Sequence, residues 1–116
     1  MTVSDPVKHE VPRHRLRNGL RSNTPQFGCF SSLSSSWTAR IVASCGWDVS
    51  LDCRRNACAF ADTSQYVIID QEHGNHDDRD MHDTVNVIAS EGVSPVVRLR
   101  AGDYGLIKRA LDCGAQ

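Results

Sequence analysis

Several features of specialised proteins are missing from this 116-residue chain. No apolar run approaches the roughly 20 residues that a membrane-spanning helix requires. Residues 1–10 also lack the apolar core of a signal peptide. The net charge is only -1, which argues against a chain that binds nucleic acid as a whole. These absences favour a cytoplasmic protein that neither spans a membrane nor binds nucleic acid.

The five cysteines are scattered and form no Cys-x-x-Cys pair. A disulfide framework prefers an even number of cysteines in a secreted chain, so idle thiols in a reducing compartment are the better interpretation. Cys53 and Cys58 are close enough to suggest a metal clip, but no second pair completes it. The phosphate-binding pattern Gly-x-Gly-x-x-Gly is absent as well.

What is present is the composition of an ordinary globular protein, with 40% hydrophobic and 23% charged residues. The length allows at most one domain with a modest core. The most informative stretch is Tyr66–Asp70, a short β-branched run that ends at a carboxylate and is followed by Glu72 and His73. Such a run is typical of a buried parallel strand, and α/β enzymes carry catalytic side chains at the carboxyl ends of these strands.

Strands and helices alternate along the predicted chain. The pattern predicts strands at 25–30, 66–70 and 93–98, and helices at 12–22, 37–45, 77–91 and 104–112. The acidic residues from Asp77 to Asp83 fit a helix start, where the helix dipole favours carboxylates. We expect His76 and His82 to lie at the surface. Three parallel strands cannot close a barrel, so the pattern indicates half or less of a parallel α/β fold and a truncated chain.

Five segments in this order resemble the HpcH/HpaI aldolase family. The segments are Leu20–Gly28, Gly46–Asp48, Ile68–Gly74, Pro95–Arg98 and Leu106–Gln116. Each motif alone is weakly specific, whereas the ordered series is strongly so. The resemblance runs from about Leu16 to Gln116 and covers the N-terminal half or less of the family's (β/α)8 TIM barrel. It implies an incomplete barrel, with the first three βα units preceded by a short N-terminal helix.

The resemblance also implies an activity. Members of the family are aldehyde-lyases of the metal-dependent class II type, which cleave a 4-hydroxy-2-oxo acid by a retro-aldol reaction to pyruvate and an aldehyde. The implied partners are therefore a small-molecule 2-oxo acid and an aldehyde. Family members are usually homo-oligomers, often hexamers.

Particular residues match the functional positions of the family. His73 matches the general acid/base, which handles the proton of the 4-hydroxyl through a metal-bound water, and Asp70 matches the carboxylate that pairs with it. A nearby carboxylate fixes the tautomer of an imidazole. Arg98 matches the arginine that binds the 2-oxo acid and steadies the enolate, a role suited to fixed paired donors. Asp112 matches an acidic residue near the active site or its subunit interface.

Two departures from the family pattern limit what the resemblance implies. The family's divalent ion, Mg2+ or Mn2+, acts as a Lewis acid and is held by a Glu and an Asp on later strands. Those positions lie beyond residue 116, so we expect no metal ligand in this chain. Phe30 stands where many members have Trp, which leaves the fit of the aldehyde open.

The interval 49–65 interrupts the resemblance. In the family pattern Gly46–Asp48 runs directly into Tyr66–Asp70, so a genuine loop here would break a buried strand. We hypothesise that residues 49–65 are a translated, unspliced intron; a spliced message that keeps these codons would contradict this. Residues 1–12 are predicted to be a disordered tail, and residues 13–116 to be the N-terminal part of the barrel.

Two alternatives remain beside the aldolase. One is a small, non-catalytic metal-binding module, because His73, His76, Asp77 and His82 are ligands of suitable type. This module predicts tight binding of Zn2+ or Ni2+ by the chain alone. The other alternative is that the polypeptide is a catalytically inactive fragment, because its barrel never closes.

Overall fold

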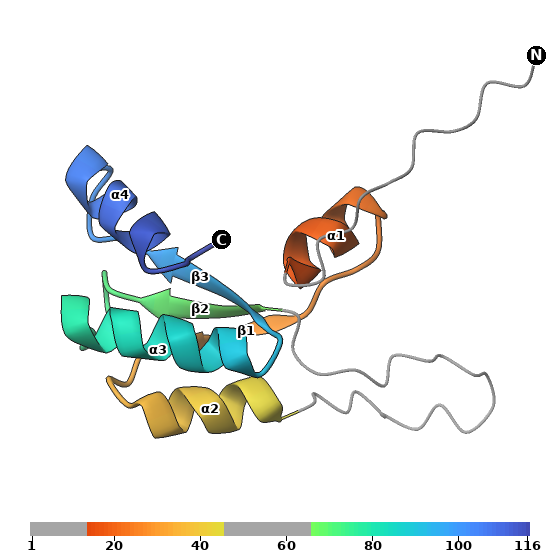
Figure 1. Ribbon diagram of the computed structural model, residues 1–116, viewed down its shortest axis with the longest axis horizontal. Coiled ribbons are helices and arrows are strands. Elements are labelled where there is room, and N and C mark those ends of the chain that lie inside the picture. The colour runs from red at the N-terminus through yellow and green to blue at the C-terminus, as the bar shows by residue number, and fades with distance from the viewer. Residues whose placement is uncertain (1–13, 46–65) are drawn as a thin grey trace, which may run out of the picture.

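The computed structural model describes residues 14–45 and 66–116, and Figure 1 shows their arrangement. The elements in chain order are α1 (Arg15–Arg21), β1 (Gly28–Ser31), α2 (Ser36–Ser44), β2 (Tyr66–Asp70), α3 (Asp78–Ser90), β3 (Ser94–Arg98) and α4 (Tyr104–Asp112). The predicted alternation of strands and helices is confirmed. The predicted tail at 1–12 and the interval 49–65 lie outside the described residues.

The strands form one parallel sheet in the order β1-β2-β3. In its register, Phe30 lies beside Ile68 and Ile68 beside Val96, while Asp70 lies beside Arg98 at the carboxyl edge. Because side chains alternate between the two faces of a strand, these five residues share one face of the sheet. That face is where the predicted site residues of β1, β2 and β3 gather.

The opposite face of the sheet carries the hydrophobic core. Val67 and Ile69 of β2 are fully buried there. Helices α2 and α3 contact each other and lie side by side across this face (Figure 1). Their buried apolar residues are Ala39, Ala43, Met81, Val85 and Ile88. The helical spacing of these residues gives each helix one apolar stripe toward the sheet, which burial stabilises.

Three of the helices begin with a capping side chain. Ser35, Asp77 and Asp103 each accept a hydrogen bond from the backbone N–H three residues later, over 3.3, 2.8 and 3.1 Å. These caps satisfy backbone donors that the first turn of a helix leaves unpaired. The acidic start predicted for α3 is thus confirmed, with Asp77 as its cap.

A hydrogen bond from the Leu16 N–H to the Ser94 hydroxyl, over 3.1 Å, holds α1 at the amino end of the sheet. Strand β1 starts later than predicted because the preceding residues are bonded to the end of α1. There the Thr24 N–H donates to the Gly19 carbonyl over 3.0 Å. Gly28 then opens the strand at a point where a Cβ atom would collide with the Tyr66 backbone and ring.

Large apolar side chains remain exposed near both outer strands of the sheet. They include Phe30, Trp37, Ile41, Tyr104 and Leu111. In an open parallel sheet such side chains have no further strand or helix to cover them. Among the helices of the described ranges, none combines the length and the apolar character needed to cross a membrane.

Candidate active site at the carboxyl edge of the sheet

The Asp70 carboxylate organises the turn that follows β2. Its residue is only 5% exposed. Oδ1 accepts hydrogen bonds from the backbone N–H groups of Glu72 and His73, each over 3.0 Å, and Oδ2 lies 3.6 Å from Nη1 of Arg98. A Cβ atom on Gly74 would collide with the Asp70 carbonyl, so the turn closes tightly over the end of the strand.

The same contacts keep Asp70 ionised. The bond from the His73 N–H is the strongest influence that holds the pKa of Asp70 below its ordinary value. The bond from the Glu72 N–H and the charge of Arg98 act in the same direction, while burial of the carboxyl opposes them. A carboxylate that accepts backbone hydrogen bonds is stabilised in its charged form. The edge of the sheet therefore carries a fixed negative charge beside Arg98.

Arg98 lies at the centre of a cluster that also contains Asp70, Glu72 and His73. Its Nη2 lies 2.5 Å from Oε2 of Glu72, and both side chains are partly exposed, at 40% and 37%. The sequence pattern predicts no separate role for Glu72. The feature of the sequence that could have indicated this contact is the position of Glu72, two residues after Asp70. From there its carboxylate reaches Arg98 on the neighbouring strand. Arg98 is thus held between one buried and one partly exposed carboxylate.

His73 is the most exposed member of the cluster. Its side chain is 67% exposed, and ring Nε2 lies 3.7 Å from Oε2 of Glu72. The contact that the structure provides between Asp70 and His73 runs through the backbone N–H of the histidine. The pairing of the Asp70 carboxylate with the imidazole stays a prediction. An exposed imidazole beside a carboxylate is accessible for proton transfer with a substrate.

His76 is buried, and the expectation that it lies at the surface is wrong. It is 2% exposed, with ring Nε2 3.1 Å from the Ser31 carbonyl at the end of β1. Arg100 adds a bond from Nη2 to the His76 carbonyl over 3.3 Å, and one from Nε to the Gln71 carbonyl over 3.2 Å. The buried ring contacts the end of β1, and Arg100 holds the backbone on either side of the turn that carries His73.

The side chains suggested as ligands of a metal-binding module have other contacts in the structure. His76 contacts β1, Asp77 caps α3, and His82 is exposed beside Asp83, as expected for a surface residue. Within residues 14–45 and 66–116, no three His, Cys, Asp or Glu side chains are placed to hold a metal ion together. The described part of the chain therefore gives the metal-binding module no support.

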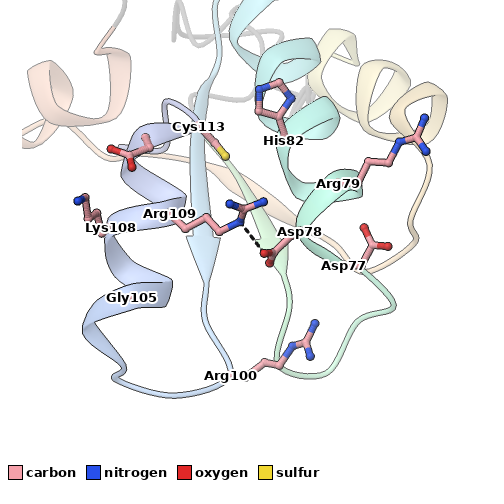
Figure 2. A pocket seen from close by; sticks show the side chains of 10 residues that line it. Asp77, Asp78, Arg79, His82, Arg100, Gly105, Lys108, Arg109 and Cys113 are labelled. Carbon is pink, nitrogen blue, oxygen red and sulfur yellow. Dashed lines mark ion pairs between the residues drawn. The ribbon is translucent and has the colours of Figure 1, made fainter.

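Phe30 and Asp112 occupy different surroundings. Phe30 is 56% exposed on β1, in the row of residues just below Asp70 and Arg98 on the same face. Asp112, the last residue of α4, lines a separate open pocket between α3 and α4. Figure 2 shows this pocket, in which Arg109 of α4 points to Asp78 of α3. Phe30 thus lies beside Asp70 and Arg98, while the role of Asp112 near the active site or a subunit interface stays a prediction.

Comparison with known proteins shows what the chain is similar to. No family model matches the chain. The chain is 29% identical to the hydroxypyruvate/pyruvate aldolase of Agrobacterium fabrum, over 91% of its own length and 34% of that protein. It is 33% identical to the pyruvate aldolase of Rhizobium etli, over 92% and 35%, and 32% identical to the 2-keto-3-deoxy-L-rhamnonate aldolase of Salmonella gallinarum, over 87% and 32%.

Solved structures agree with these relatives. The HpcH/HpaI aldolase/citrate lyase family protein of Burkholderia cenocepacia superposes with a TM-score of 0.67 and 31% identity, over 88% of this chain and 34% of that protein. The HpcH/HpaI aldolase of Desulfitobacterium hafniense gives 0.65 and 27%, over 86% and 32%. The chain spans about a third of the length of the proteins it matches.

The sheet order and the similar structures define the fold class. The described residues form the first three βα units of a TIM barrel, preceded by a short helix, as predicted. The resemblance to the HpcH/HpaI aldolases is likewise confirmed, and the coverage of about a third of these proteins is consistent with an N-terminal part.

Proposed function

We propose that this chain is the N-terminal part of a pyruvate-type aldolase that cleaves a 4-hydroxy-2-oxo acid to pyruvate and an aldehyde. The observation that carries the proposal is the cluster of Asp70, Glu72, His73 and Arg98 at the carboxyl edge of the sheet. In TIM barrels this edge is the one that carries catalytic residues. The aldolase names of the similar proteins support the same reaction class.

In the proposed mechanism Arg98 binds the carboxylate and oxo group of the substrate. Its guanidinium offers paired donors and remains charged throughout the reaction. Its partly exposed side chain, next to the buried and ionised Asp70, presents these donors at the edge of the sheet. As negative charge develops on the enolate, the fixed positive charge stabilises it more than it stabilises the substrate.

His73 is proposed to move the proton of the 4-hydroxyl group. Its ring is exposed at the same edge, and its backbone is held by the Asp70 carboxylate and by the buried loop around His76. An imidazole on a fixed loop is a suitable general base and acid near neutral pH. Phe30, in the row below, is proposed to shape the space for the aldehyde.

The divalent ion that the resemblance implies belongs to the proposal as well. Mg2+ or Mn2+ would supply a Lewis acid for the enolate. The resemblance implies that its ligands, a Glu and an Asp, lie on later strands beyond residue 116. We therefore assign no step to the ion, and we propose a homo-oligomeric, cytoplasmic enzyme for the complete protein.

A retro-aldol assay tests the proposal. The product of the complete transcript is incubated with 4-hydroxy-2-oxo acids, and the release of pyruvate is followed with lactate dehydrogenase. We expect pyruvate release that EDTA abolishes and Mn2+ or Mg2+ restores. Absence of release with all substrates would contradict the aldolase proposal.

The same assay on the 116-residue chain alone tests the second candidate, a catalytically inactive polypeptide. The exposed apolar side chains near both outer strands favour this candidate. Pyruvate release by the isolated chain would contradict it.

A further inference from the structure

Arg98 already has a carboxylate partner where the substrate is proposed to bind. Oε2 of Glu72 lies 2.5 Å from Nη2, and Oδ2 of Asp70 lies 3.6 Å from Nη1. Two carboxylates thus face one guanidinium. A third carboxylate, brought by a 2-oxo acid, would meet a net negative charge, and it would compete for a donor that is already in use.

The two carboxylates differ in how firmly they are held. The Asp70 side chain is 7% exposed and accepts two backbone hydrogen bonds. The Glu72 side chain is 37% exposed, and its carboxylate forms ion pairs with Arg98 and with the ring of His73. An exposed ion pair contributes little net stability because water replaces it readily. Glu72 is therefore the partner that an incoming anion displaces.

An alternative partner of the displaced Glu72 carboxylate is the imidazole of His73, whose Nε2 lies 3.7 Å from Oε2. We propose that Glu72 is an intramolecular competitor for the substrate carboxylate at Arg98, and that it moves toward His73 when that carboxylate binds. Glu72 is a positioning residue in this scheme, since it acts through Arg98 and His73. The inference rests on the proposed role of Arg98.

Oxalate is a suitable probe, because its paired carboxylates match the donors of a guanidinium. We compare oxalate binding by calorimetry for the full chain, for Glu72→Gln and for the matched control Asp78→Asn. Asp78 forms an equally short pair with Arg109 between α3 and α4, so its loss changes the net charge by the same amount. We expect about threefold tighter binding for Glu72→Gln, in the range expected for an exposed ion pair, and unchanged binding for Asp78→Asn.

The movement of Glu72 has its own readout. The ring resonances of His73 are followed by NMR, with His73→Gln for assignment and circular dichroism to confirm that each variant folds. Saturation with oxalate is expected to shift these resonances in the wild-type chain and to leave them in place in Glu72→Gln. A merely structural role for Glu72 would produce no such difference.

The outcomes separate the two claims. If wild type binds oxalate, Arg98→Lys does not, and Glu72→Gln binds with equal or lower affinity than wild type, the inference about Glu72 is overturned while the role of Arg98 stands. If neither wild type nor Glu72→Gln binds oxalate, both the inference and the proposed role of Arg98 are overturned. Tighter binding by Glu72→Gln and Asp78→Asn alike would also overturn the inference, since it would reflect net charge alone.

Discussion

Two arginine–carboxylate pairs of equal length occupy different settings in this molecule. Arg98 and Glu72 meet at the carboxyl edge of the sheet, and Arg109 and Asp78 meet between α3 and α4 (Figure 2), each pair at 2.5 Å. Only the first pair has a buried third member, because Asp70 is fixed by backbone hydrogen bonds beside Arg98. The comparison teaches that the anchoring of the neighbours, rather than the length of an ion pair, distinguishes a candidate site from a surface contact.

The largest effect is expected on catalysis. In the complete enzyme, Arg98→Lys should lower kcat/KM for pyruvate release by about 100-fold, since a single ammonium replaces paired donors to the developing enolate. Arg109→Lys should leave kcat/KM within about twofold of wild type. Equal losses in the two variants would remove the functional distinction between the pairs.

The next effect is expected on stability. Asp70→Asn should lower the urea midpoint of unfolding clearly, because the neutral amide weakens the bonds to two backbone N–H groups and the contact with Arg98. Asp78→Asn removes a charge from an exposed pair and should move the midpoint much less. Unfolding curves followed by circular dichroism compare the variants. A larger loss for Asp78→Asn would show that the helix contact is the better anchored of the two.

The stability of the chain at low pH should depend on the Asp70 carboxylate. The pKa of Asp70 is lower in the folded chain than its ordinary value of 3.8, so its contribution to stability is present above that value and is lost as the pH falls through the folded pKa. Below about pH 4, the free energy of unfolding of wild type should therefore decrease more steeply with falling pH than that of Asp70→Asn. Parallel pH profiles would contradict this assignment.

The smallest effect is expected at the helix pair. Arg109→Gln breaks the contact with Asp78, whose side chain is 46% exposed, and should cost less than about 1 kcal/mol of unfolding free energy. High salt should reduce the difference further, because it screens exposed charges. A loss well above that value, measured by urea unfolding, would mean that the pair also positions α4.

The sequence predicts the bounds of an element well where local residues determine them, and less well where contacts with other elements do. Strand β2 and helix α4 match their predicted bounds, since an apolar run ends at Asp70 and a capping Asp103 precedes Tyr104. The start of β1 was missed because it depends on hydrogen bonds between Thr24 and α1. The periodicity of a sequence describes contacts within an element and does not reveal such bonds between elements.

The same limit applies to the candidate site. Asp70, His73 and Arg98 could be named as candidates because they lie at or just after strand ends and match positions of the family resemblance. The position of His76 depends on the Ser31 carbonyl of a different strand, and the contact of Glu72 with Arg98 depends on the register between β2 and β3. Both were missed because they arise from the packing of segments that are distant in the sequence.

The bond between Leu16 and Ser94 has a consequence for the order of folding. It joins residues that are 78 positions apart, whereas β1, β2 and β3 pair in the order in which they leave the ribosome. The sheet can therefore grow strand by strand during synthesis, while α1 must wait until β3 has been made. Contacts of long sequence separation form late because loop closure costs entropy. Among the described elements, α1 comes first in the sequence and is thus among the last to reach its final position.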